Sequence, residues 1–134
     1  MIEITVREAV IAFPALEALA NHDLPQKASW RMGRMIDKLR PVLDRYGKHR
    51  NEIIKKHGEP NKDGVHEVKK RPEALEAFEK EHDELFEQKE KVDYDPIPLS
   101  LFKRREKDKD GNEREVEIEL NGAHLGRCMK FFSE

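Results

Sequence analysis

"PQKASWRMGRMIDKLRPVLDRYGKHRNEIIKKHG", residues 25–58, is the stretch that decides the fold. Apolar side chains recur in it every three or four positions, which is the spacing of one face of an α-helix. Pro25 suits a first helical position and Gly58 a C-terminal stop. At a rise of about 1.5 Å per residue the helix would be roughly 50 Å long, so we expect an elongated molecule, unless the helix folds back at a kink at Pro41. The apolar row consists of Ala28, Met32, Met35, Leu39, Val42, Tyr46 and Ile53, flanked by Ile36, Leu43 and Ile54.

A second row, of positive charge, follows the same predicted helix about 100° from the apolar row. We call it the basic stripe, and it consists of Lys27, Arg31, Arg34, Lys38, Arg45, Lys48 and Lys55. Residues 24–57 hold ten Lys and Arg against three Asp and Glu, whereas residues 72–91 hold three Lys against eight Asp and Glu. Two explanations stay open. The stripe either pairs with the acidic flank of a neighbouring helix, or it is a binding face for a protein or a nucleic acid.

Trp30 lies off the apolar row, between Ser29 and Arg31. An exposed Trp flanked by Arg is typical of a protein-binding surface. The alternative is that Trp30 packs beneath the predicted first helix or the C-terminal segment. The candidate binding residues are therefore Trp30, Lys27, Arg31, Arg34, Lys38, Arg45 and Lys48.

Helices are expected on both sides of this stretch. Thr5 and Glu8 fit a capping box, which predicts a helix start, and Pro14 predicts a kink or a break in that helix. After a loop over 59–70 with an Asp-Gly turn, a third helix is predicted over 72–91. Three helices joined in this way favour an antiparallel arrangement. The inward row of the third helix consists of Leu75, Phe78, His82 and Leu85, with Phe86 beside it, and His82 is interpreted as a partnered interior or boundary histidine.

The last third of the chain changes to the spacing of strands. Residues 92–102 contain two prolines and should be extended, and residues 102–120 fit a β-hairpin around an Asp-Gly turn. A two-residue turn would place like charges opposite each other, such as Glu106 against Glu115. A three-residue loop over 109–111 places opposite charges across the strands instead. We therefore predict that loop, with its glycine in the left-handed conformation.

The hairpin region has one apolar face that must be covered, formed by Phe102, Val116, Ile118 and Leu120. The cover is predicted to be a short helix capped by Asn121, with Leu125, Cys128, Met129 and Phe132 inward and Cys128 as a buried structural thiol. The fold class is thus α+β in a single domain of 134 residues. An antiparallel three-helix part (1–91) precedes an extended segment, a β-hairpin and a short C-terminal helix (92–134).

The order of these segments resembles a family of short phage and prophage proteins of unknown function. The likeness spans most of the chain, although the hairpin is richer in Lys, Arg and Glu than is typical of that family. It implies a phage origin and no established activity, and it carries over no catalytic residue. The matching stretches are ITVREAVIAFPALEALA (4–20), LPQKASWRMGRMIDKL (24–39), RNEIIKKHGE (50–59) and VDYDPIPL (92–99), together with the acidic third helix and the C-terminal helix.

Motifs of catalysis and of metal binding are not found in the sequence. The six histidines lack the spacing of a metal site, and the glycine of segment 108–113 is misplaced for a calcium loop. Phosphate-binding glycine loops and nucleophile motifs are missing as well, so we expect neither an enzyme nor a cofactor. The sequence also has no membrane-spanning run and no signal peptide, which predicts a cytoplasmic location in a host cell without membrane contact.

We therefore predict a non-enzymatic phage accessory protein that binds a host or virion protein, for example to inhibit a host defence or polymerase. A nucleic-acid-binding regulator is the first alternative, although the net charge of −2 argues against it. A small-ligand binder or sponge is the second. A homodimer, or a tight complex with another protein, through the first two helices is also expected, because so small a domain would otherwise expose a broad apolar face.

Overall fold

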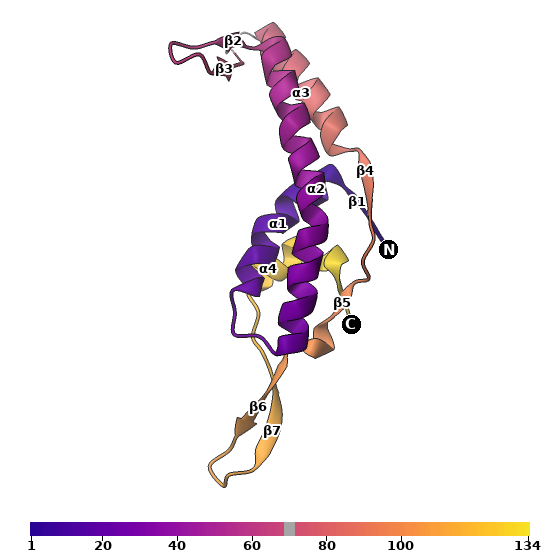
Figure 1. Ribbon diagram of the computed structural model, residues 1–134, viewed down its shortest axis with the longest axis vertical. Coiled ribbons are helices and arrows are strands. Elements are labelled where there is room, and N and C mark those ends of the chain that lie inside the picture. The colour runs from indigo at the N-terminus through magenta and orange to yellow at the C-terminus, as the bar shows by residue number, and fades with distance from the viewer. Residues whose placement is uncertain (69–71) are drawn as a thin grey trace.

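The computed structural model describes residues 1–68 and 72–134 and shows an elongated α+β molecule (Figure 1). Its axis is α2 (Gln26–His57), which continues without a break through Pro41. The first half of α2 packs against α1 (Val6–Ala20). The predicted elongation is therefore confirmed, and the alternative of a helix that folds back at its proline is wrong.

The start of α1 is fixed by the predicted capping box. The hydroxyl of Thr5 accepts a hydrogen bond from the backbone N–H of Glu8 at 3.1 Å, and the Glu8 carboxylate accepts one from the backbone N–H of Thr5 at 3.1 Å. The break predicted at Pro14 is wrong, because α1 continues through it. A proline removes one backbone hydrogen bond, and burial of Ala12 and Ala15 on either side of it keeps the helix intact.

The second half of α2 lies beside α3 (Pro72–Phe86). This helix begins where predicted but ends five residues early, since residue 91 belongs to strand β4 (Lys89–Val92). β4 pairs antiparallel with β1 (Ile2–Thr5), and the ladder runs from Ile2 opposite Val92 to Thr5 opposite Lys89. The N-terminal strand is thus hydrogen-bonded to the segment that follows α3.

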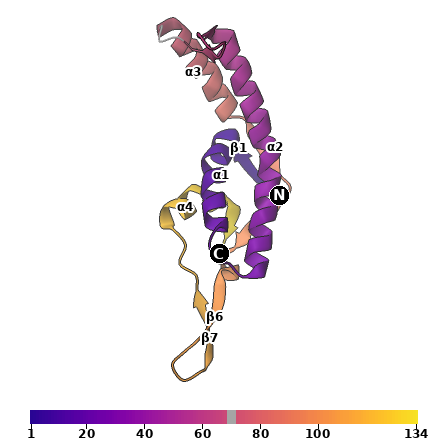
Figure 2. The ribbon, with the colours of Figure 1, turned by 60° about the vertical axis from the view of Figure 1, so that its left-hand side comes forward.

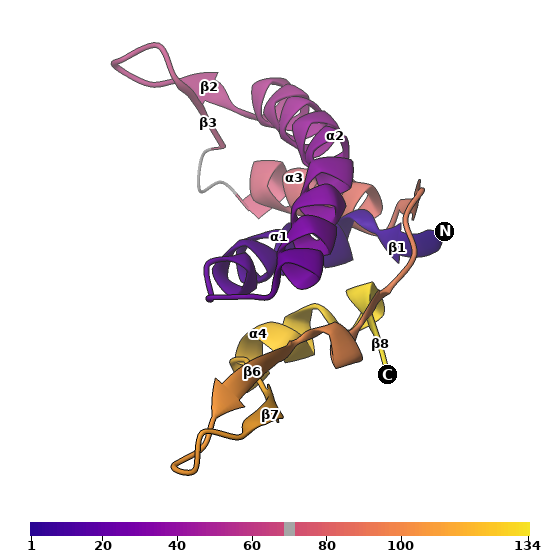
Figure 3. The same cartoon turned by 60° about the horizontal axis from the view of Figure 1, so that its bottom comes forward.

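A small hairpin, β2 (Glu59–Pro60) with β3 (His66–Glu67), projects from the far end of α2 (Figure 3). Its loop is closed by Asn61, whose side-chain oxygen accepts hydrogen bonds from the backbone N–H of Asp63 at 2.9 Å and of Val65 at 3.0 Å. The following Gly64 has φ +79°, a left-handed conformation that favours glycine. The predicted Asp-Gly turn is therefore confirmed.

At the opposite end of the molecule a second hairpin, β6 (Lys103–Lys107) with β7 (Glu113–Glu117), projects away from the helices (Figure 1). Asp108 accepts hydrogen bonds from the backbone N–H of Asp110 and of Asn112, each at 2.9 Å. Gly111 has φ +78°, so the predicted three-residue loop is confirmed. The predicted register is confirmed too, with the opposite pairs Lys103–Glu117, Arg105–Glu115, Glu106–Arg114 and Lys107–Glu113.

Short elements complete the chain. The predicted cap is confirmed, because the Asn121 side chain accepts hydrogen bonds from the backbone N–H of Ala123 at 2.9 Å and of His124 at 3.2 Å. The helix that it caps lies beside α1, on the side away from α2 (Figure 2). The short elements are β5 (Ile97–Pro98), the 3₁₀ helix η1 (Leu99–Leu101), α4 (Gly122–Arg127), the 3₁₀ helix η2 (Met129–Phe131) and β8 (Phe132–Ser133), which pairs in parallel with β5.

The C-terminal cover differs from the prediction at one position. Cys128 is buried, with its Sγ 3.5 Å from the carbonyl oxygen of Ala12, and burial raises its thiol pKa to about 11. Met129, predicted inward, is 73% exposed, whereas Phe131 is buried in its place. The physical reason is the 3₁₀ turn of η2, because the tighter winding changes which side chain faces α1.

The main core lies between α1 and the first half of α2, and side chains of β1, β4 and the C-terminal segment complete it. The apolar faces of α1 and α2, through which a homodimer is predicted, are covered in this core by contacts within a single chain. The largest completely buried side chains are Phe131, Ile4, Leu16, Leu19, Met32, Met35, Leu39, Ile97 and Cys128.

The second half of α2 and α3 form a thinner part, which we call the distal arm. None of the residues of α3 is fully buried. The arm is held by half-buried rings: Tyr46 Oη lies 2.8 Å from His82 Nε2, and Tyr46 stacks on Phe86 with 5.4 Å between ring centroids. His82 is thus a partnered boundary histidine, as predicted. Burial lowers its pKa, and the nearby positive charge of Arg50 lowers it further.

Candidate protein-binding surfaces

Trp30 lies on the outer surface near the start of α2 and is 66% exposed. Its neighbours in the core-facing row, Ala28 and Met32, are buried, so the turn of the helix directs the indole outward. The alternative that Trp30 packs beneath α1 or the C-terminal segment is therefore wrong. The indole borders a shallow hollow of about 470 Å³, lined by Gln26, Lys27, Trp30, Arg31 and Leu101.

Arg31, a predicted member of the basic stripe, is tied to the body of the protein. Its guanidinium lies over the ring of Tyr94, 5.3 Å from the centroid, and Nη2 donates to the carbonyl oxygen of Pro96 at 3.4 Å. The side chain is half-buried. Arg31 therefore holds the extended segment before β5 against α2, next to Trp30 in the sequence.

The remaining stripe residues lie on exposed turns of α2, and the structure decides which of them are paired. Arg45 donates to Glu90 in β4 at 3.2 Å. The helix-to-helix ion pairs with α3 use residues outside the stripe, since both Lys56 and His57 contact Glu81. Within residues 1–68 and 72–134, the exposed stripe residues that form no ion pair are Lys27, Arg34, Lys38, Lys48 and Lys55.

The predicted pairing of the stripe with the acidic helix is therefore wrong for most of its members. The reason is geometric: α3 runs beside only the second half of α2 (Figure 1), so the first half of the stripe has no acidic helix next to it. Lys27, Arg34 and Lys38 thus form one positively charged row that begins beside Trp30. A row of exposed positive charges attracts acidic partners and repels basic ones.

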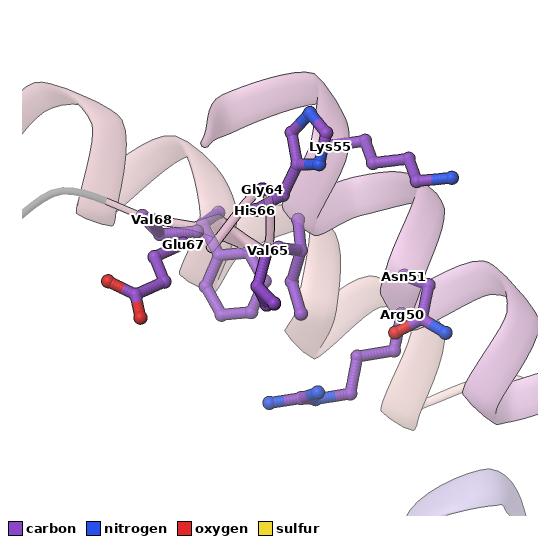
Figure 4. Close-up of a pocket in the computed structure, with 10 residues that line it drawn as sticks. Arg50, Asn51, Lys55, Gly64, Val65, His66, Glu67 and Val68 are labelled. Carbon is purple, nitrogen blue, oxygen red and sulfur yellow. The ribbon is translucent and has the colours of Figure 1, made fainter. Parts of the chain in front are cut away.

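A second concave surface, which we call the distal groove, lies at the far end of α2 (Figure 4). It has a volume of about 670 Å³ and lies between the last turns of α2, the β2–β3 hairpin and α3. Sequence reasoning does not identify this groove. The lining residues are Arg50, Asn51, Ile54 and Lys55 from α2, Phe78 from α3, and residues 64–68 from the hairpin.

Gly58 fixes the hairpin wall of this groove against the helix. A Cβ atom there would lie 2.5 Å from the carbonyl oxygen of Ile54 and 2.6 Å from that of Glu67, so only glycine allows the approach. A usable signal was the repetition of one loop sequence, since Asn61-Lys62-Asp63-Gly64 matches Asp108-Lys109-Asp110-Gly111 in type and in hydrogen bonding. The sequence pattern predicts a hairpin loop for the second copy and only a turn for the first.

Metal-binding groups do not converge in the described part of the chain: no three or more His, Cys, Asp or Glu side chains lie close enough to share an ion. Within the same ranges, no helix has the length and apolar character needed to cross a membrane. Comparison with known protein families, with curated protein sequences and with solved structures finds no match to this chain. Its function must therefore be argued from the surfaces themselves.

Proposed function

We propose that this chain is a non-enzymatic accessory protein that acts by binding a host or virion protein through Trp30 and the first half of the basic stripe. The observation that supports the proposal is the 66% exposure of Trp30 on a part of α2 whose inner face is packed in the core. Tryptophan and arginine are enriched among the residues that contribute most to protein–protein affinity. Tryptophan also offers a large contact area at a low cost in conformational entropy, because its side chain has only two χ angles.

The chemistry of the surface defines the partner. The indole and the neighbouring Leu101 offer apolar area, while Lys27, Arg34 and Lys38 add positive charge along one side. The complementary surface is an apolar pocket with an acidic rim. Because the cations are exposed, they should raise the association rate at low salt more than the affinity at high salt.

A protein fits these features better than a nucleic acid does. The net charge of the chain is −2. Trp30 and Tyr94 both lie at the first turns of the stripe, whereas binders of single strands interleave several aromatics with cations along the site. Nucleic acid and a second copy of the chain therefore serve as the competing outcomes of the test.

The test compares the wild type with W30A and with a matched control, M129A. Both positions are large, apolar and exposed, and they lie on different elements, so neither change should affect folding. Partners captured from host extract by the wild type are purified, and their affinities for the three proteins are measured. We expect W30A to weaken binding by about tenfold or more and M129A to leave it unchanged.

Three results would contradict the proposal. One is capture that is equal for W30A and the wild type. Another is capture that disappears on nuclease treatment, which would point to the nucleic-acid alternative. The third is a light-scattering mass of twice 15.7 kDa that reverts to one copy in W30A, because Trp30 would then serve a homodimer.

A further inference from the structure

We infer that the distal groove is a second docking site, which takes an acidic peptide segment with an apolar anchor side chain. The inference goes beyond the proposed function, because the groove shares no lining residue with the Trp30 surface. Ile54 in the groove follows Trp30 by 24 residues of continuous helix, a separation of about 36 Å. A partner at one site would therefore leave the other site accessible.

The floor of the groove is apolar and open to a ligand. Ile54, Val68 and Phe78 are half-buried, and Val65 at the hairpin is 59% exposed. These side chains come from α2, the hairpin and α3, so they form one surface only in the folded arm. Known peptide sites combine such an apolar floor with a few polar groups that fix orientation. An apolar anchor of the ligand would lie on this floor.

The rim of the groove selects the charge of the ligand. Arg50 and Lys55 project from α2, and neither forms an ion pair within the ranges that the structure describes. Glu67, the one carboxylate in the lining, is turned away from the α2 wall (Figure 4) and accepts a hydrogen bond from the Asn61 side chain at 2.9 Å. The open side of the groove is therefore positive, which favours acidic residues beside the anchor and disfavours basic ones.

The groove walls are formed before any ligand binds. The hairpin loop is closed by backbone hydrogen bonds between Asn61 and Val65 at 2.8 Å and between Gly64 and Asn61 at 3.0 Å. Gly58 sets the hairpin directly against the helix end. A preformed site retains more of its contact energy as affinity than a site that must order on binding.

The test uses a pool of short fluorescent peptides in which apolar residues are set among Asp and Glu, and a matched pool with Asn and Gln in their place. Binding is measured by fluorescence anisotropy against the wild type, K55E, V65S and the double variant R50E/K55E. The control R34E/K38E carries the same charge change on the same helix outside the groove. Thermal melts of each variant show whether the arm is still folded, and K55E and V65S alter only exposed side chains.

We expect the acidic pool to bind the wild type and the neutral pool to bind at least about tenfold more weakly. K55E and V65S should each reduce the affinity, while R34E/K38E and W30A retain it. Retention in W30A separates this result from the fate of the proposed function. Equal binding of both pools, no binding at millimolar peptide, or equal loss in R34E/K38E would overturn the inference. Competition by single-stranded DNA as strong as that by peptide would overturn it in favour of a phosphate ligand.

Discussion

Replacing Gly58 by alanine tests the joint between α2 and the β2–β3 hairpin. The backbone at Gly58 is extended, with φ −106° and ψ 172°, so alanine can adopt it without strain. The new Cβ would nevertheless lie 2.5 Å and 2.6 Å from two carbonyl oxygens and 2.8 Å from the carbonyl carbon of Glu67. These are backbone atoms on both sides of the joint, so neither side can yield without moving the hairpin or the helix end.

The expected magnitude follows from this crowding. Overpacking of this kind costs about 1–3 kcal/mol, and the reduced freedom of the unfolded chain offsets roughly 0.4–1 kcal/mol of it. G33A is the matched control, because Gly33 lies within α2 and nothing stands within 4 Å of its new Cβ. That change should stabilise by about 1 kcal/mol, since alanine is the better helix former. The same substitution should thus change stability in opposite directions within α2 and directly after its end.

Urea denaturation of the wild type, G58A and G33A measures the two changes, and hydrogen exchange locates them. In G58A the amide of Asn61, which donates to the carbonyl oxygen of Val65 at 2.8 Å, should lose protection. Detachment of the hairpin would limit the global loss, so the exchange data are needed beside the denaturation curve. A G58A protein as stable as G33A, with unchanged protection at Asn61, would refute the reasoning.

Three other predictions concern single side chains. Burial, reinforced by the charge of Arg50, lowers the pKa of His82 below its ordinary 6.5. The unfolded chain therefore binds a proton at a higher pH than the folded one, so the free energy of unfolding should fall as the pH drops below 6.5. Thermal melts across pH should show this slope in the wild type and a flatter slope in H82Q. Gly111→Val should destabilise the β6–β7 hairpin, because a β-branched residue is strained at φ +78°, and unchanged amide exchange in the hairpin would contradict this. Cys128, with a buried thiol and a pKa raised to about 11, should react with a thiol reagent only on unfolding, so rapid labelling of the native protein would contradict its placement.

Much of the local structure could be predicted because it depends on residues close in sequence. The capping box of Thr5 and Glu8 spans one helical turn, and the β6–β7 register follows from charges facing each other across one short loop. The pairing of β1 with β4 could not be predicted, since it joins segments at opposite ends of the helical part, and neither segment has a period that identifies its partner. The end of α3 was misplaced for the same reason.

The candidate surfaces were harder to predict than the fold. The spacing of Trp30 placed it beside the apolar row, where only the positions of α1 and the C-terminal segment decide between exposure and burial. The opposite charge totals of α2 and α3 predict that the two helices are neighbours, and this is confirmed. Charge totals do not show, however, which cations face α3. In the structure those are Lys56 and His57 rather than members of the stripe.

The single helix α2 connects two regions with different amounts of burial. From Ala28 to Val42 its inner row is fully covered, whereas beyond Val42 its apolar residues are only half-buried against an α3 with no completely buried side chain. Unfolding should therefore proceed in two stages, with the last turns of α2 and α3 opening before the core between α1 and the first half of α2. Sequence changes in the distal arm would consequently leave this core intact. The far end of the helix is thus free to diversify while the end that carries Trp30 keeps its shape.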